Sequence, residues 1–304
     1  MSRMVSILHH PEYDAQTVSD DHRFPMRKYT ALARYIERSG LVTSVSPFIE
    51  PQAADFAQLS AAHSEDYVRA CLDLTLDARA QRTIGFELTA AVVMRSQLSC
   101  GGSLLAGEIA LDEGIACNAA GGSHHAKREG GAGFCVFNDV GVAIGALKAK
   151  GLVRRALVID CDVHQGDGTA DIFADDPDVF TLSLHCEKNW PFRKVKSDLD
   201  VGLDIRTGDL EYLNALRRSV GAALEGFRPD IVYYNAGVDP HQDDRLGKLS
   251  LSDAGIESRD EYIVDTIREQ GIPLVCVIGG GYSDDVQHLA RLHGSVFMAA
   301  DRAD

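Results

Sequence analysis

The chain has 304 residues, 45% of them hydrophobic and 25% charged, a composition typical of a folded globular protein. Its formal net charge of -15 argues against non-specific nucleic-acid binding and fits a cationic substrate. The apolar runs are too short to span a bilayer, and the first residues lack the apolar core of a secretory signal, so we expect no membrane segment and a cytoplasmic location. The seven cysteines form no C-x-x-C pair, which indicates neither a disulfide framework nor a thiolate zinc site.

Short β-branched runs alternate with amphipathic stretches along the chain. Strands are predicted at residues 4–8, 41–46, 114–118, 155–160, 178–184, 230–235 and 273–280. Helices are predicted within residues 27–40, 88–114, 208–227 and 252–271. The alternation predicts an α/β fold with three α/β/α layers, a mainly parallel central sheet and one domain over residues 1–304. Functional residues are then expected just beyond the carboxyl ends of the strands.

The first unusual segment reads GGSHHAKREGGAGFCVFND and contains the adjacent histidines His124 and His125. Neighbouring side chains in extended backbone point in opposite directions, so two adjacent imidazoles serve one site only in a special loop shape. The glycines of this segment make both a helix and a strand unfavourable. The alternative is a pair of ordinary surface histidines, and the choice depends on whether other segments supply carboxylates and a metal site.

The segment DCDVHQGDG follows the predicted strand at 155–160 and alternates Asp160, Asp162 and His164. In extended backbone these three side chains face the same way and can converge on one ion. A polar turn that caps the next helix would explain Asp167. It does not explain three polar groups on one face of a buried strand, because burying such groups without partners is costly. The segment NAGVDPHQDD places Asp239 beyond another predicted strand.

Together, Asp162, His164 and Asp239 form a three-ligand set that leaves coordination positions open, as a catalytic zinc site requires. Two carboxylates and one imidazole also suit Fe²⁺, Co²⁺ or Mn²⁺. The segment VIGGGYSDD then delivers Tyr282 after three glycines at the end of the last predicted strand. A neutral phenol there can donate a hydrogen bond to a carbonyl oxygen that gains negative charge, whereas the alternative is a tight turn followed by a packing tyrosine.

In this order the segments resemble the zinc-dependent histone deacetylase family, which includes bacterial acetylpolyamine amidohydrolases and acetoin-utilisation proteins. The resemblance is carried by GGSHHA, GFCVFND, DCDVHQGDG, SLH, GVDPHQDDRLG and GGGY, together with HRFPMRKY and HSEDYV nearer the N-terminus. It implies the arginase/deacetylase type of α/β fold. The stretches KNWPFRK and SDLDVGL look more like the class IV branch than the class I branch.

The resemblance also implies a role for each matching residue. The metal ligands would be Asp162, His164 and Asp239. His124, oriented by Asp160, and His125, oriented by Asp167, would act on the attacking water. Tyr282 would polarise the substrate carbonyl. The substrate tunnel would be lined by Gly133, Phe134, Leu246, Gly280 and either Trp190 or Phe192. A structural K⁺ or Na⁺ would be held by Asp160, Asp162, His164, Ser183 and Leu184.

We therefore expect a zinc-dependent deacetylase that removes an acetyl or longer acyl group from an acyl-lysine, with Fe²⁺ or Co²⁺ as alternative ions. A deacetylase of acylpolyamines or other small amides is the first alternative, and an inactive module that binds acyl-lysine is the second. A binuclear manganese ureohydrolase is disfavoured, because Gly166 and Gly237 stand where carboxylates for a second ion would be needed.

Overall fold

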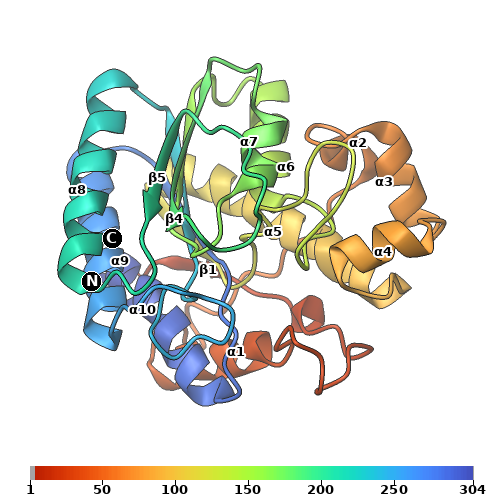
Figure 1. Cartoon of the computed structure of the whole chain (residues 1–304), viewed down its shortest axis with the longest axis horizontal. Coiled ribbons are helices and arrows are strands. Elements are labelled where there is room, and N and C mark those ends of the chain that lie inside the picture. The colour runs from red at the N-terminus through yellow and green to blue at the C-terminus, as the bar shows by residue number, and fades with distance from the viewer. Residues whose placement is uncertain (1–3, 304) are drawn as a thin grey trace.

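The computed structural model describes residues 4–303 and is built around one parallel seven-stranded sheet, in the order β1-β2-β7-β6-β3-β4-β5 (Figure 1). The strands are β1 Ser6–Leu8, β2 Ile115–Asn118, β3 Ala156–Asp160, β4 Val179–Cys186, β5 Leu199–Leu203, β6 Ile231–Ala236 and β7 Leu274–Ile278. Every residue of β2, β3, β6 and β7 is buried, as expected for parallel strands that helices cover on both faces.

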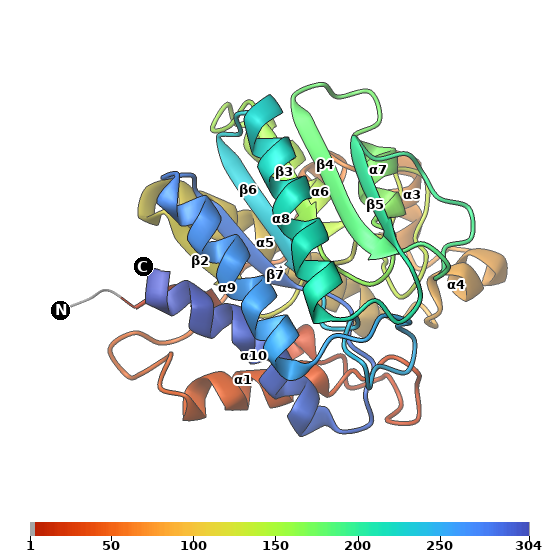
Figure 2. The same cartoon turned by 60° about the vertical axis from the view of Figure 1, so that its left-hand side comes forward.

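Helices cover both faces of the sheet and give the three layers that the sequence predicts (Figure 2). One face carries α5 Ala90–Glu113 and α6 Asp139–Ala149, which pack against each other. The other carries α8 Asp209–Gly226, α9 Asp253–Glu269, α10 Val286–Ala303 and α1 Lys28–Arg38. The shorter helices are η1 Pro11–Tyr13, α2 Phe56–Leu59, α3 Glu65–Leu72, α4 Ala78–Ile84 and α7 Asp167–Ile172.

The predicted helices at 27–40, 88–114, 208–227 and 252–271 are confirmed as α1, α5, α8 and α9. The predicted strand at 41–46 is wrong: its residues form bends, the Thr43 N–H donates to the Ser46 carbonyl, and Val45 is 91% exposed. A β-branched run needs a neighbouring strand, and this one finds none. Conversely, β5 was missed because its sequence, LDVGL, alternates exposed and partly buried residues at the sheet edge and pairs only with β4.

Strand order brings the predicted functional segments together. β2, β7, β6, β3 and β4 are successive neighbours in the sheet, so the segments beyond their carboxyl ends meet at one edge. These segments hold the two adjacent histidines, the three glycines before Tyr282, Asp239, the Asp160–His164 run and the KNWPFRK stretch. Within residues 4–303, no helix has the length and apolarity needed to cross a bilayer. All seven cysteines are buried and free.

Candidate active site

Three potential metal ligands converge at this sheet edge. Nδ1 of His164 lies 3.0 Å from Oδ1 of Asp162 and 3.0 Å from Oδ2 of Asp239. The other carboxylate oxygens are held by backbone amides: the Gly280 N–H donates to Asp162 Oδ2 over 2.6 Å, and the Val163 N–H donates to Asp239 Oδ1 over 2.8 Å. These backbone bonds fix both carboxylates so that one oxygen of each faces the imidazole.

The electrostatics of this trio favour a cation. Burial, followed by the charge of Asp162, raises the pKa of Asp239 to about 8. Burial opposes protonation of His164, but its hydrogen bonds with both carboxylates outweigh burial and raise its pKa to about 10. Two buried carboxylates that face each other need a positive charge between them. The three ligand atoms lie within 4.8 Å of one another, so the donor set fits one divalent ion.

The two adjacent histidines lie beside the trio, each against its own carboxylate. His124 Nδ1 is 2.6 Å from Asp160 Oδ2, and His125 Nδ1 is 2.7 Å from Asp167 Oδ1. The ring centroids of His124 and His125 are 4.0 Å apart. The far oxygen of Asp167 pairs with the Lys127 ammonium at 3.0 Å. Because a carboxylate only accepts, each Nδ1 carries the proton, and the Nε2 of a neutral ring is left as an acceptor.

The two imidazoles differ in charge. Burial lowers the pKa of His124, but the carboxylates of Asp160 and Asp162 outweigh it and raise the pKa to about 9. Burial and the charge on His124 lower the pKa of His125 to about 3. Near neutral pH and without an ion, His124 is therefore an imidazolium and His125 a neutral imidazole. Such a pair offers one proton donor and one proton acceptor in the same site.

The glycine run before Tyr282 lies directly against the trio. A Cβ on Gly280 would lie 2.1 Å from Asp239 Oδ2 and 2.7 Å from Asp162 Oδ2, so no side chain fits there. The Tyr282 N–H donates to Asp244 Oδ2 over 2.7 Å, which fixes the backbone after the run. Burial, followed by the charges of Asp162 and Asp239, raises the pKa of Tyr282 well above its ordinary value. The phenol therefore keeps its proton and can donate it in a hydrogen bond.

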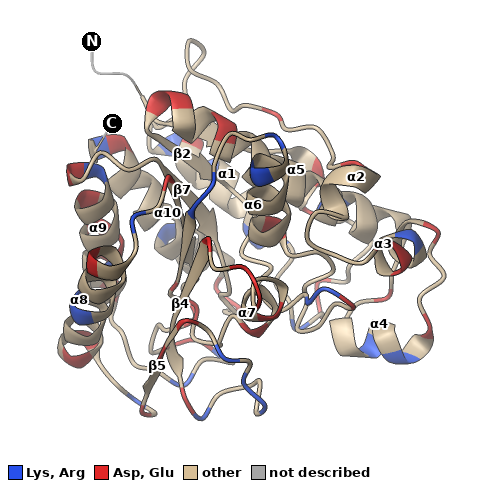
Figure 3. Ribbon diagram, turned by 90° about the horizontal axis from the view of Figure 1, so that it is seen from above, with Lys and Arg blue, Asp and Glu red and all other residues tan. Residues whose placement is uncertain are grey.

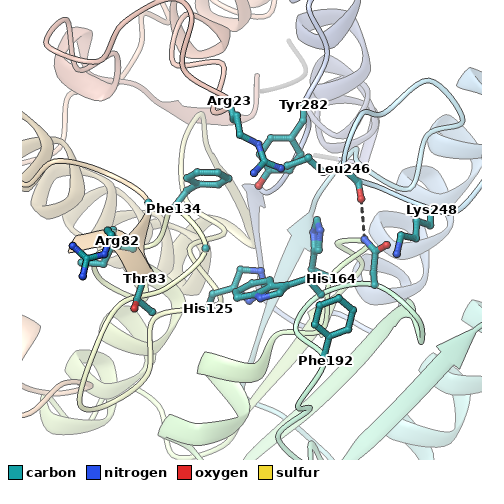
Figure 4. A pocket seen from close by; sticks show the side chains of 15 residues that line it. Arg23, Arg82, Thr83, His125, Phe134, His164, Phe192, Leu246, Lys248 and Tyr282 are labelled. Carbon is teal, nitrogen blue, oxygen red and sulfur yellow. Dashed lines mark hydrogen bonds between the residues drawn. The ribbon is translucent and has the colours of Figure 1, made fainter. Parts of the chain in front are cut away.

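An open pocket of about 430 Å³ leads to these groups (Figure 4). Phe134 forms one wall and has a positive φ of 68°, a strained conformation for a non-glycine residue. Trp190 forms the facing wall, with its ring centroid 4.5 Å from that of His125. A Cβ on Gly133 would lie 2.7 Å from the His125 ring and 2.8 Å from Trp190, so the glycine lets the walls approach. Leu246 lines the same pocket.

The sequence left open whether Trp190 or Phe192 faces Phe134. Trp190 contacts both His125 and His164, with ring centroids 4.5 Å and 6.4 Å apart, whereas Phe192 is 82% exposed. Both line the pocket, but Phe192 lies farther out. The inner wall is therefore Trp190.

Comparisons with known proteins agree with this arrangement. Residues 22–299 match the family model described as the histone deacetylase domain. The chain belongs to the histone deacetylase family. It is 42% identical to an uncharacterized protein of Picosynechococcus sp., with 97% of each chain covered. It is 30% identical to Histone deacetylase 2 of Arabidopsis thaliana, over 94% of this chain and 79% of that protein. The crystal structure of a histone deacetylase homologue from Aquifex aeolicus superposes with a TM-score of 0.85 at 27% identity, over 98% of this chain and 84% of that one.

In this member of the histone deacetylase family, the two positions expected to need carboxylates for a second ion hold Gly166 and Gly237, and a Cβ on Gly237 would lie 2.5 Å from Asp162 Oδ2. Ser183 lies beside Asp160 in the register of β3 and β4, and its Oγ lies 3.0 Å from His185 Nδ1. The hydrocarbon side chain of Leu184 has no ligand atom, so that residue can offer a cation only its backbone carbonyl.

A second group, formed by His241, Asp253 and His288, also brings potential ligand atoms together. Nε2 of His241 and of His288 lie 2.9 Å and 3.2 Å from the same Asp253 oxygen. The other Asp253 oxygen pairs with Arg291, and His241 Nδ1 accepts from the Asp243 N–H. Nε2 of His241 therefore carries a hydrogen, so this group is already satisfied without an ion.

Three supporting residues escaped the sequence analysis. Lys28 is buried and donates from Nζ to the Gly279 carbonyl over 2.9 Å, although it lies within the quoted segment HRFPMRKY. Asn235, at the end of β6, donates to Asp160 Oδ1 over 2.9 Å. Asp244 holds the Tyr282 amide and belongs to the quoted segment GVDPHQDDRLG. The segments were visible in the sequence, but the role of these members depends on contacts between distant loops.

Proposed function

We propose that this histone deacetylase-family amidohydrolase is zinc-dependent and removes an acyl group from the side-chain amine of an acyl-lysine in a protein or peptide. The observation that carries the proposal is the convergence of Asp162, His164 and Asp239 beneath the pocket that Phe134 and Trp190 line. Next to this trio lie the differently charged pair His124 and His125. A long, thin substrate stem fits between facing aromatic walls better than a branched substrate does.

One Zn²⁺ would be held by Asp162, His164 and Asp239, with Fe²⁺ and Co²⁺ as alternatives. When bound, the ion supplies Lewis-acid activation of the amide carbonyl and of the attacking water. A monovalent K⁺ or Na⁺ would be held on the neighbouring strand ends by Asp160, Asp162, His164, Ser183 and Leu184.

His125, His124 and Tyr282 each have a separate role in moving or donating protons during hydrolysis. His125 is neutral, and its Nε2 accepts the proton of the attacking water while Asp167 holds Nδ1–H. The His124 imidazolium stabilises the negative charge that develops, and the protonated histidine pair supplies the proton to the departing amine. Tyr282 donates from its hydroxyl to the carbonyl oxygen as that oxygen gains charge.

The space beyond the trio favours a short acyl group. A recess of about 20 Å³ continues inward and is bounded by Tyr29, Arg95 and Cys135. A single water needs roughly 10 to 15 Å³, so this recess holds little more than a methyl group. We therefore expect acetyl-lysine to be a better substrate than long-chain acyl-lysine.

The test uses chelator-treated protein reloaded with defined amounts of Zn²⁺ and a panel of acetyl-lysine peptides, long-chain acyl-lysine peptides and acetylpolyamines. We expect zinc-dependent release of acetate, with kcat/KM highest for acetyl-lysine peptides. If the enzyme hydrolyses acetylpolyamines but no acyl-lysine peptide, its substrates are acylpolyamines and not acyl-lysine residues. Binding of acyl-lysine peptides without turnover, at any metal loading, would favour the inactive binding module.

A further inference from the structure

The mouth of the pocket carries positive charge in a chain whose formal net charge is -15. Arg23, Arg82 and Lys248 line it, and no aspartate or glutamate is among its lining residues. The three come from separate segments: the loop before α1, helix α4, and the loop between β6 and α9. Figure 4 shows them on three sides of the opening, around His125 and His164.

These three side chains are exposed and, among residues 4–303, none forms an ion pair with a carboxylate. Lys248 instead donates from Nζ to the Lys188 carbonyl over 3.0 Å. The three cations that line the opening are therefore available to pair with an incoming anionic group.

The loop between β4 and β5 adds to the same charge. It contains Lys188, Arg193, Lys194 and Lys196, and Figure 3 shows basic residues along it. The loop also begins with the exposed Glu187, whose Oε2 lies 3.7 Å from Nε2 of His185, and the carboxylates at its far end accept hydrogen bonds from neighbouring groups. Asp198 accepts from Thr181 at two atoms, and Asp200, at the start of β5, accepts from Gln165 and from the Ser197 N–H.

We propose, resting on the proposed function, that the mouth selects acyl-lysine residues flanked by acidic residues of a protein or peptide. When the acyl-lysine stem reaches the trio, the neighbouring residues of the substrate lie at the mouth, beside Arg23, Arg82 and Lys248. A cleft lined by one sign of charge concentrates partners of the opposite sign. A short acidic segment fits better than a long polyanion, because the remainder of the chain is acidic. Lysine-rich tails and acylpolyamines meet like charge instead.

The first experiment uses the zinc-loaded enzyme and three acetyl-lysine peptides that differ only in their flanking residues: acidic, uncharged or basic. At low salt we expect kcat/KM to fall in that order, with about tenfold or more between the acidic and basic peptides. At high salt the difference should shrink, because mobile ions screen exposed charges. Equal rates, or faster hydrolysis of the basic peptide, would overturn the proposal.

The second experiment reverses charge at the mouth. Arg82→Glu and Lys248→Glu should each reduce the preference for the acidic peptide several-fold while leaving kcat on the uncharged peptide near wild type. Arg228→Glu is the matched control: it makes the same change in net charge at an exposed residue just before β6, at the opposite end of the sheet. An equal loss in the control would assign the preference to bulk charge and overturn the role of the mouth. Circular dichroism checks that each variant folds, and Arg82→Gln is the milder substitute.

Failure of the proposed function is separable from failure of this inference. If no peptide is hydrolysed, the acyl-lysine activity is wrong, yet binding of the same fluorescently labelled peptides to the zinc-loaded protein still ranks the flanking charges. Tighter binding of the acidic peptide, lost in Lys248→Glu, would support the mouth as an acidic-segment site. Binding that ignores flanking charge, or favours the basic peptide, would overturn it.

Discussion

The base of the pocket, formed by the metal-ligand trio, the two adjacent histidines and their aspartates, differs from its mouth in how its charged groups are paired. At the base, the buried side chains of Asp160, Asp162 and Asp167 each accept from an imidazole or a backbone amide. At the mouth, exposed cations such as Arg82 and Lys248 form no ion pair within residues 4–303. The base is therefore fixed before any substrate arrives, as chemistry requires, whereas the mouth keeps its charges free for recognition.

The difference predicts that changes at the base lower turnover, while changes at the mouth alter the choice of substrate. The largest effect among residues that do not bind the ion is expected for Tyr282→Phe. Removing one donor to a developing oxyanion costs on the order of 100- to 1000-fold in kcat. KM should change less, because the hydroxyl acts mainly in the transition state.

The matched control for Tyr282→Phe is Tyr262→Phe, which alters a tyrosine on α9 that packs against the core. Metal content should remain normal in both variants. Binding of a hydroxamate, a compound that binds the metal ion directly, should also remain normal in both. If Tyr282→Phe retains near-normal kcat on the best acyl substrate, the glycine run delivers only a packing residue and the base lacks its expected hydrogen-bond donor.

A smaller loss is expected for Asp167→Asn, because Asp167 orients His125 without touching the ligand trio. Loss of such an orienting carboxylate costs roughly 10- to 100-fold in activity. The pH profile of kcat should shift as well, since the imidazole loses the charge that holds its Nδ1–H. Asp167 begins helix α7, and Asp175 is an exposed residue shortly after that helix. Asp175→Asn is therefore the control and should behave as wild type. Loss of bound metal in Asp167→Asn would show that the ligands are misassigned.

Metal affinity should depend on pH because an ion and a proton compete for His164. In the ion-free protein the pKa of His164 is raised to about 10, so the ring is protonated at neutral pH. Raising the pH towards 10 removes this competing proton, and the zinc affinity should rise by about tenfold per pH unit for each proton displaced. Chelator-competition titrations at several pH values measure the slope. An affinity that is flat or falls with pH would contradict the assigned protonation.

The smallest expected effect concerns two aromatic residues that line the pocket, Trp190 on the inner wall and Phe192 farther out. Trp190 makes an edge contact with His125, and such aromatic contacts are worth about 0.5 to 1.5 kcal/mol, or roughly 2- to 10-fold. Trp190→Ala should therefore lower kcat/KM at least this much, whereas Phe192→Ala, which changes an exposed residue, should lower kcat/KM less. A larger loss of kcat/KM in Phe192→Ala would show that Phe192, and not Trp190, forms the inner wall.

The convergence of the three potential ligands was predictable from the sequence because each lies shortly after the end of a buried strand. Asp160, Asp162 and His164 follow one buried apolar run, and Asp239 follows another, so strand order alone brings them together. The HH pair was ambiguous from its own residues. The family resemblance implied a separate aspartate for each ring, and Asp160 and Asp167 lie against His124 and His125.

The mouth was not predictable, because its members come from loops whose positions no local pattern specifies. Arg23, Arg82 and Lys248 carry no motif that links them, and the net charge of the chain suggested the opposite sign. The errors in the fold have a similar origin. Residues 41–46 have strand composition without a neighbouring strand, and Leu199–Leu203 forms an edge strand although Asp200 and Gly202 weaken the strand pattern of its sequence.

The most direct test of the account is the metal content of three proteins purified without chelators: wild type, His164→Ala and His288→Ala. We expect about one transition-metal ion per wild-type chain, nearly none in His164→Ala, and an unchanged content in His288→Ala, whose histidine belongs to the second group around Asp253. Deacetylase activity should follow the metal content. Two ions per wild-type chain, or metal lost from His288→Ala and kept in His164→Ala, would contradict a single catalytic ion held by Asp162, His164 and Asp239.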